Sequence, residues 1–164
     1  MKIISAFETL RARALRRIER LGFLAPTLIR FTLGLVFVGT GWGKLHSLND
    51  VTAFFTSLGI PLSALNARVV AVTEFGGGLL LLLGFGTRLV ALPMAFTMVV
   101  AILTAKRGDI DGVVTLIGFE EWSYLVMFLV IALLGAGPLS LDALLTRRLD
   151  ARPREALPAA PTEV

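Results

Sequence analysis

The stretch VVAVTEFGGGLLLLLGF, residues Val69–Phe85, decides what kind of protein this is. About 20 apolar residues in a helix, each adding about 1.5 Å, cross the hydrocarbon core of a bilayer. This run, with its flanks, approaches that length, and Glu74 is its single charged residue. A carboxylate within a membrane span costs about 3 kcal/mol or more unless it is protonated, paired or hydrated. Glu74 is therefore either a packing group or a group that the protein uses.

The composition of the whole chain favours an integral membrane protein. Of the 164 residues, 55% are apolar and 17% are charged, and the mean hydropathy is +0.81. Soluble domains average about 45–50% apolar and about 25% charged residues. The length suits one compact domain.

The residue inventory excludes several kinds of chemistry. The chain has no cysteine and one histidine, His46, so disulfides, thiol relays, cysteine-ligated clusters, thiolate zinc sites and paired-histidine haem ligation within the chain are ruled out. We therefore expect no metal site and no intrinsic cofactor. The net charge of +4 comes with no stacking aromatics or groove-reading motif, so nucleic-acid binding is not expected. Basic residues crowd both termini, which favours anchoring at an anionic membrane face.

Four apolar spans predict an all-α, integral membrane four-helix bundle. Because the runs are continuous and lack period-2 alternation, helices fit them better than a barrel. The last span is short unless the apolar stretch Val113–Phe119 extends it backwards. The predicted spans cover about residues 24–43, 67–85, 89–105 and 122–136.

The flanking charges predict the orientation and the division of the chain. More Lys and Arg residues lie on the side of the two termini than on the other, so we expect a multi-pass protein of the cytoplasmic (inner) membrane with both termini cytoplasmic. Residues 1–22 read as a basic amphipathic helix on the inner leaflet, with partner binding as the alternative. Residues 23–146 form the membrane domain, and residues 147–164 form a basic and then Pro-rich disordered tail.

Two short helices are expected outside the spans. In the first outer loop, Asn49 or Asp50 can cap a helix that Gly59 and Pro61 end, and this helix could lie over the bundle as a lid. After the fourth span, Ser140 can cap a second short amphipathic helix.

Three ionisable residues form a candidate polar or ligand cluster in the first two spans: Arg30, Lys44 and Glu74. Arg30 and Lys44 each differ in depth from Glu74 by about 10 Å at 1.5 Å per residue, so either can reach it. Snorkelling of both cations to headgroups competes with this pairing. For Glu74, a buried structural hydrogen bond competes with a proton-relay or ligand-contact role.

Glycines in the first two spans are expected to let helices approach closely. They are Gly39 and Gly43, at GxxxG spacing, and Gly76, Gly77 and Gly78. Local loosening of the helix at the glycine run, which would expose carbonyls to a ligand, is the alternative.

A second candidate polar group lies at the predicted outer face and consists of His46, Arg68, Glu120 and Glu121. An exposed loop is the favoured interpretation, because burying two adjacent carboxylates is costly. If the fourth helix began near Val113, both carboxylates would enter the bilayer. Trp42, Trp122 and Tyr124 fit both an aromatic belt and a quinone pocket, so they do not discriminate.

Four motifs in order resemble the DoxX family of small four-helix membrane proteins, over roughly residues 28–145. They are RFTLGLVFVGTGWGKL at Arg30–Leu45, LGIP at Leu58–Pro61, EFGGGLLLLLGFGTRL at Glu74–Leu89 and GPLSLDALL at Gly137–Leu145. By that resemblance Arg30, Lys44, Glu74, Arg88 and Asp142 fall at motif positions.

The resemblance implies a membrane subunit of a quinone-linked oxidoreductase, or a membrane partner of soluble redox-stress proteins. Since the chain has no redox ligand set of its own, we expect it to bind a quinone or to anchor a soluble or membrane redox partner. In the preferred reading, the region of Arg30 and Glu74 contacts the quinone or buffers a proton. A structural scaffold, or a carrier of small solutes or ions, is the competing class.

Overall fold

The computed structural model describes residues 11–13, 15, 16, 19 and 21–150, and its regular elements there are all helical. The predicted all-α fold is confirmed. The predicted N-terminal amphipathic helix lies largely outside the described residues, as does the tail from residue 151. The helices are α2 (Leu24–His46), α3 (Leu48–Ser57), α4 (Ser63–Leu83), α5 (Thr87–Thr104), the 3-10 turn η1 (Arg107–Asp109), α6 (Val113–Gly118), α7 (Glu120–Leu134) and α8 (Leu141–Asp150).

Three of these helices, α2, α4 and α5, are long and apolar enough to cross a membrane. The fourth predicted span corresponds to α7, which has 15 residues. Phe119, in an extended conformation with φ −73° and ψ 143°, separates α7 from the six-residue α6. The apolar stretch Val113–Phe119 therefore does not extend α7 as one continuous helix. Passage of α7 through the bilayer stays a prediction.

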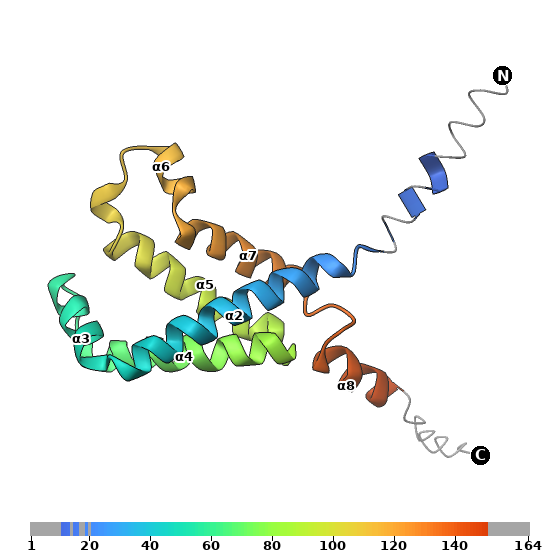
Figure 1. Cartoon of the computed structure of the whole chain (residues 1–164), viewed down its shortest axis with the longest axis horizontal. Helices are drawn as coiled ribbons and strands as arrows, with labels where there is room; N and C mark the ends of the chain where they lie inside the picture. The colour runs from blue at the N-terminus through green and yellow to red at the C-terminus, as the bar shows by residue number, and fades with distance from the viewer. Residues whose placement is uncertain (1–10, 14, 17–18, 20, 151–164) are drawn as a thin grey trace, which may run out of the picture.

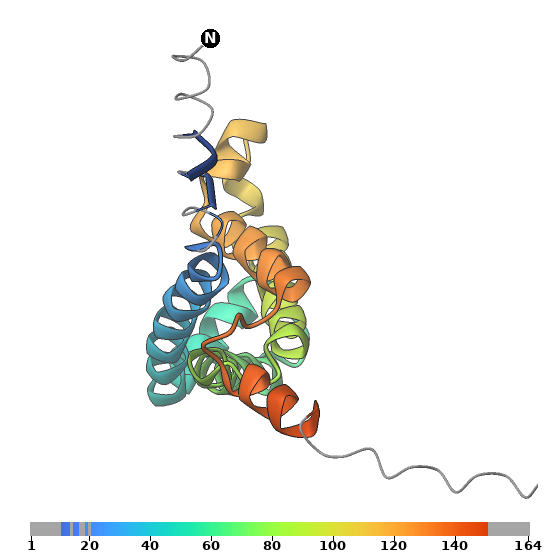
Figure 2. The ribbon, with the colours of Figure 1, turned by 90° about the vertical axis from the view of Figure 1, so that its right-hand side faces the viewer.

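The bundle consists of two helix pairs, α2 with α4 and α5 with α7, which make the most extensive contacts. Figure 1 shows α5 leading away from α4 at an angle after their connecting turn, and Figure 2 shows the molecule from the right-hand side of Figure 1, along its long axis. We call the end that carries α3, η1 and α6 the α3 end, and the end that carries the α4–α5 turn and α8 the α8 end. A core of buried apolar side chains joins the pairs, and its members include Leu33, Phe37, Leu81, Met94, Met98, Phe128 and Ile131.

The closest helix contact, between α2 and α4, uses glycines only partly as expected. A Cβ on Gly41 would lie 2.7 Å from the Cα of Phe75, and one on Gly78 would lie 2.6 Å from the backbone nitrogen of Val38. On the other side of α4, a Cβ on Gly77 would lie 2.7 Å from the sulfur of Met94 in α5. Close approach at Gly77 and Gly78 therefore agrees with the prediction.

The other three predicted packing glycines are corrected by the structure. A Cβ on Gly39, Gly43 or Gly76 would meet nothing within 4 Å. In α2 the helix contact uses Gly34 and Gly41 instead, which are seven residues and so nearly two turns apart. The GxxxG pair lies on a different side of the helix, because its members are offset by two residues from Gly41.

The two short helices flank opposite ends of the bundle. At the α3 end, α3 packs on α4, and it begins directly after Ser47 without a side-chain cap. Asn49 and Asp50 therefore lie in its first turn, and neither caps it. At the α8 end, the Oγ of Ser140 accepts a hydrogen bond from the backbone N–H of Ala143 at 3.1 Å. The predicted cap of this helix is present.

Replacing Gly41 with leucine should destabilise the protein, because the added side chain would force α2 away from the backbone of α4. Overpacking of this kind costs about 1–3 kcal/mol or more. Gly39→Leu, two residues earlier on the same helix, enters open space and should change stability little. Thermal unfolding in detergent would measure both. Equal losses for the two variants would contradict this account of the α2–α4 contact.

Candidate functional site

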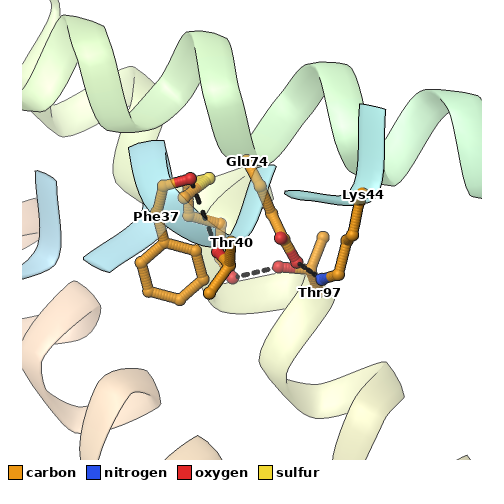
Figure 3. Close-up of polar contacts among 6 residues, drawn as sticks. Phe37, Thr40, Lys44, Glu74 and Thr97 are labelled. Atoms are coloured by element: carbon orange, nitrogen blue, oxygen red, sulfur yellow. Dashed lines mark hydrogen bonds and ion pairs between the residues drawn. The ribbon is translucent and has the colours of Figure 1, made fainter. Parts of the chain in front are cut away.

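The central feature of the site is an ion pair between the two helices of the first pair. Glu74, from α4, is 2% exposed, whereas the side chain of Lys44, from α2, is 32% exposed. The Nζ of Lys44 donates to the Oε1 of Glu74 (Figure 3). The structure therefore pairs Glu74 with Lys44, where the sequence left Lys44 and Arg30 as alternatives.

The ion pair leaves one strong acceptor unused. The Oε2 of Glu74 is buried and has no hydrogen-bond partner among the described residues. Buried polar atoms in native proteins nearly always have a partner, and an unsatisfied one costs about 1–3 kcal/mol. The Oε2 of Glu74 can therefore accept a hydrogen bond from a molecule bound beside it.

A cavity of about 790 Å³ lies beside the pair, a volume within the usual range of small-molecule sites. Its walls come from α2, α3, α4, α5 and α7 and are mostly apolar or aromatic. Thr40 and Thr97 add hydroxyls on α2 and α5, and each hydroxyl donates to a carbonyl of its own helix (Figure 3). The lining includes Phe37, Thr40, Lys44, Phe54, Phe55, Leu58, Asn66, Thr73, Glu74, Phe96, Thr97, Thr104 and Tyr124. Lys44 and Glu74 therefore form a charged patch on one wall of a mostly apolar cavity.

Part of the predicted outer polar group lies at this cavity. Glu120 and Glu121, in the first turn of α7, line it together with Lys106. The Nζ of Lys106 lies 3.9 Å from the Oε1 of Glu121 and 5.6 Å from the centroid of the Phe119 ring. Because the helix breaks at Phe119, the two carboxylates begin α7 and do not lie within one long helix.

The other two residues of that group lie elsewhere. His46 is exposed at the end of α2, where its Nδ1 lies 2.9 Å from the carbonyl oxygen of Trp42 and its ring lies 4.2 Å from the indole. Arg68, on α4, is also exposed, and neither residue lines the cavity. The outer group is therefore divided into two cavity residues and two surface residues.

Arg30 lies at the α8 end, away from Glu74. It is 1% exposed, so its side chain does not snorkel to headgroups, and its Nη2 donates to the carbonyl oxygen of Leu139 at 2.6 Å. Its Nε and Nη1 have no partner among the described residues. A Cβ on Gly84, whose φ is +67°, would collide with this guanidinium. Arg30 thus packs the α4–α5 turn against the segment that leads into α8.

Asp142 completes the polar contacts at the α8 end. Its two carboxylate oxygens accept hydrogen bonds from the backbone N–H groups of Gly86 at 2.8 Å and Thr87 at 3.1 Å. Those amides begin α5, so Asp142 supplies the negative charge that a helix N-terminus favours. Arg88, another motif position, has its Nη2 3.5 Å from the carbonyl oxygen of Leu134.

Residue-by-residue reading of the sequence missed several lining residues. Thr40, Thr73 and Thr97 are single polar residues in apolar spans, which are common, and Asn66 lies just before the second predicted span. For Thr40 the available signal is its position four residues from Lys44, since residues three or four apart share a helix face. Thr97 lies on α5, a different helix from both charges. Which faces meet depends on how the two pairs pack.

Lys44→Met should destabilise the protein, since it leaves the buried carboxylate of Glu74 without its partner. The expected loss is about 1–3 kcal/mol. Adding Glu74→Gln in the same chain should recover part of that loss, because the unpaired charge is removed. Lys106→Met serves as the control: its longer and more exposed contact with Glu121 is worth under about 1 kcal/mol. Thermal unfolding in detergent would test this, and equal losses for the two lysine variants would contradict it.

Comparison with known proteins gives the family. The model of the DoxX family matches residues 25–107, which include α2, α4, α5 and the Lys44–Glu74 pair. This chain belongs to the DoxX family. The predicted resemblance to this family is thereby confirmed; the fourth motif, at Gly137–Leu145, lies outside the matched residues.

Curated relatives match most of the chain. "Inner membrane protein YqjF" of Escherichia coli is 32% identical over 82% of this chain and 99% of its own length. "Putative oxidoreductase CatD" of Bacillus subtilis is 33% identical over 73% of this chain and 85% of its own length. "Inner membrane protein YphA" of Escherichia coli is 30% identical over 74% of this chain and 92% of its own length. No solved structure matches the chain. The protein is therefore an integral membrane member of this family.

Proposed function

We propose that this DoxX-family protein is a non-catalytic membrane subunit that binds a quinone in the cavity beside Lys44 and Glu74. The observation that carries the proposal is the buried Oε2 of Glu74, which lies next to that cavity and has no hydrogen-bond partner in the part of the chain that the structure describes. A quinone carries two carbonyl oxygens, which accept hydrogen bonds, and its reduced form carries two hydroxyls, which donate them. The ammonium group of Lys44 suits the first form and the free oxygen of Glu74 suits the second.

The remaining lining suits the flat, apolar body of such a ligand. Ligand sites are usually apolar and aromatic with a few polar groups that fix orientation. Here Phe37, Phe55 and Tyr124 contribute aromatic surface, while Thr40 and Thr97 add hydroxyls. The sequence predicted that Arg30 and Glu74 contact the quinone. This proposal keeps Glu74 and replaces Arg30 with Lys44.

A quinone that gains or loses electrons needs a second redox group, which we assign to a soluble or membrane partner. In this proposal the protein anchors that partner at the membrane. The name of the Bacillus subtilis relative contains the word oxidoreductase, which agrees with a redox setting for the family.

A scaffold or a carrier of small solutes or ions is the competing proposal. A carrier needs a polar path from Glu74 to both faces. On the way to the α8 end, Leu33 and Phe37 on α2 and Leu81 on α4 are buried among apolar side chains. No polar path is therefore evident between the ion pair and the α8 end among the described residues. This favours a ligand site that opens toward the α3 end over a carrier.

Quinone binding can be measured by quenching of tryptophan fluorescence in the purified protein in liposomes. Trp42 packs 5.6 Å from the ring of Phe75, the neighbour of Glu74, and so should report on the site. Glu74→Gln should raise the dissociation constant about tenfold to a hundredfold, since hydrogen bonds to charged groups are worth about 1.5–3 kcal/mol. Asp50→Asn, the same change on α3 outside the cavity, should leave it unchanged. A wild-type protein that binds no quinone would contradict the proposal.

We also propose that the α8 end faces the cytoplasm, so that both termini lie inside the cell. The excess of Lys and Arg residues near the termini supports this orientation. Because the sequence has no cysteine, single cysteines can be placed freely. Asp109→Cys on η1 should react with a membrane-impermeant maleimide in intact cells, whereas Arg147→Cys on α8 should react only after permeabilisation. The reverse pattern would refute this orientation.

A further inference from the structure

One wall of the cavity faces the lipid and not the water. It consists of Val69 and Val70 from α4 and of Pro93, Phe96 and Val100 from α5, and we call these five residues the α4–α5 wall. Val69 is 51% exposed and Phe96 is 66% exposed, although both line the cavity. Both residues belong to helices that are long and apolar enough to cross a membrane. Their exposed surfaces therefore face hydrocarbon.

The two helices of this wall touch each other less than the helices within each pair do. After the turn at the α8 end, α5 leads away from α4 (Figure 1). The side chains of the wall are apolar and carry no hydrogen bond or ion pair across it within the described residues. A ligand that passes between α4 and α5 at this wall would therefore break no polar interaction among the described residues.

The opposite side of the cavity is closed by aromatic packing. The ring of Phe37 on α2 lies 5.4 Å from Tyr124 and 5.0 Å from Phe128, both on α7. Aromatic pairs at this spacing add about 0.5–1.5 kcal/mol beyond their burial. A ligand that passed between α2 and α7 would have to break this cluster, whereas passage between α4 and α5 would not.

The α3 end of the cavity has a different character from the α4–α5 wall. Asn66, Lys106, Glu120 and Glu121 line it. A hydrocarbon chain would have to desolvate these groups without pairing them, which is unfavourable. The apolar part of a ligand whose polar head meets Glu74 is therefore expected to leave by the α4–α5 wall.

We propose that the α4–α5 wall is a lateral portal through which a ligand with a long hydrocarbon tail passes between the bilayer and the cavity. The polar head lies at the Lys44–Glu74 pair, and the tail extends past Val69 and Phe96 into the lipid. This inference rests on the proposed quinone site and adds to it the class of ligand, a quinone with a long isoprenoid tail, and its route. A tailless quinone reaches the same head site through the polar α3 end.

The test blocks the portal reversibly in the full chain. Because the sequence has no cysteine, Val69→Cys can be coupled to a benzyl methanethiosulfonate. A reductant, washed away before any quinone is added, removes the adduct again. The matched control is Val72→Cys, one turn along α4, which is 60% exposed and does not line the cavity. Both variants are reconstituted in liposomes. Fluorescence quenching is followed with two quinones that share a ring, one with a long isoprenoid tail and one without a tail.

The adduct at Val69 should slow binding of the long-tailed quinone about tenfold or more, which corresponds to an added barrier of about 1.4 kcal/mol. The rate of binding of the tailless quinone should change less than about twofold. Removal of the adduct from Val69→Cys should restore the original rate for the long-tailed quinone. The adduct at Val72→Cys should have no effect on either quinone. The portal is refuted if long-tailed binding is unchanged, or if both quinones slow equally. If the unmodified protein binds neither quinone, the proposed function fails, whereas a failed portal leaves wild-type binding intact.

Discussion

The close contact between the backbones of α2 and α4 is the constraint on which the rest of the structure depends. It exists because Gly41 and Gly78 have no side chain where each helix meets the other's backbone. Lys44 lies three residues beyond Gly41, and Glu74 precedes Phe75, whose backbone Gly41 touches. The contact that packs the helices therefore also brings the two charges together. Without it, each charge would have to be satisfied separately in an apolar span, at a cost of several kcal/mol.

The polar groups of the membrane domain are divided between its two ends. At the α8 end the carboxylate of Asp142 is used by the N-terminal amides of α5, and Arg30 donates to the segment before α8. Two nitrogens of Arg30 have no partner among the described residues, but Arg30 does not line a pocket of about 330 Å³ at that end. Glu74, in contrast, has its free oxygen beside a cavity. Arg30 and Asp142 therefore join elements of the fold, whereas Glu74 can contact a ligand.

The cavity follows from the way the helix pairs are assembled. The helices within each pair make more extensive contacts than the two pairs make with each other, and the core that includes Leu33, Met94 and Phe128 joins the pairs. Toward the α3 end the pairs diverge (Figure 1), and α3 supplies an additional wall of the cavity through Phe54 and Phe55. One side of the resulting chamber faces hydrocarbon and its end is polar, so the same chamber can accommodate the two unlike parts of an amphipathic molecule.

The amino-acid sequence predicted the membrane class, the long helices and the unusual position of Glu74, because these follow from the length of the apolar runs and from the cost of a charge in lipid. It also identified the short helix capped by Ser140, whose signal is local. The choice between Lys44 and Arg30 as the partner of Glu74 depends on how the helices pack, since both cations lie within reach of Glu74 along the helix axis. The tertiary structure also decided that Gly34 and Gly41 meet α4 while Gly39 and Gly43 do not. The physical reason is the same in both cases: a sequence fixes the faces of a helix, but the rotation of each helix about its axis is set by all the side chains that pack against it.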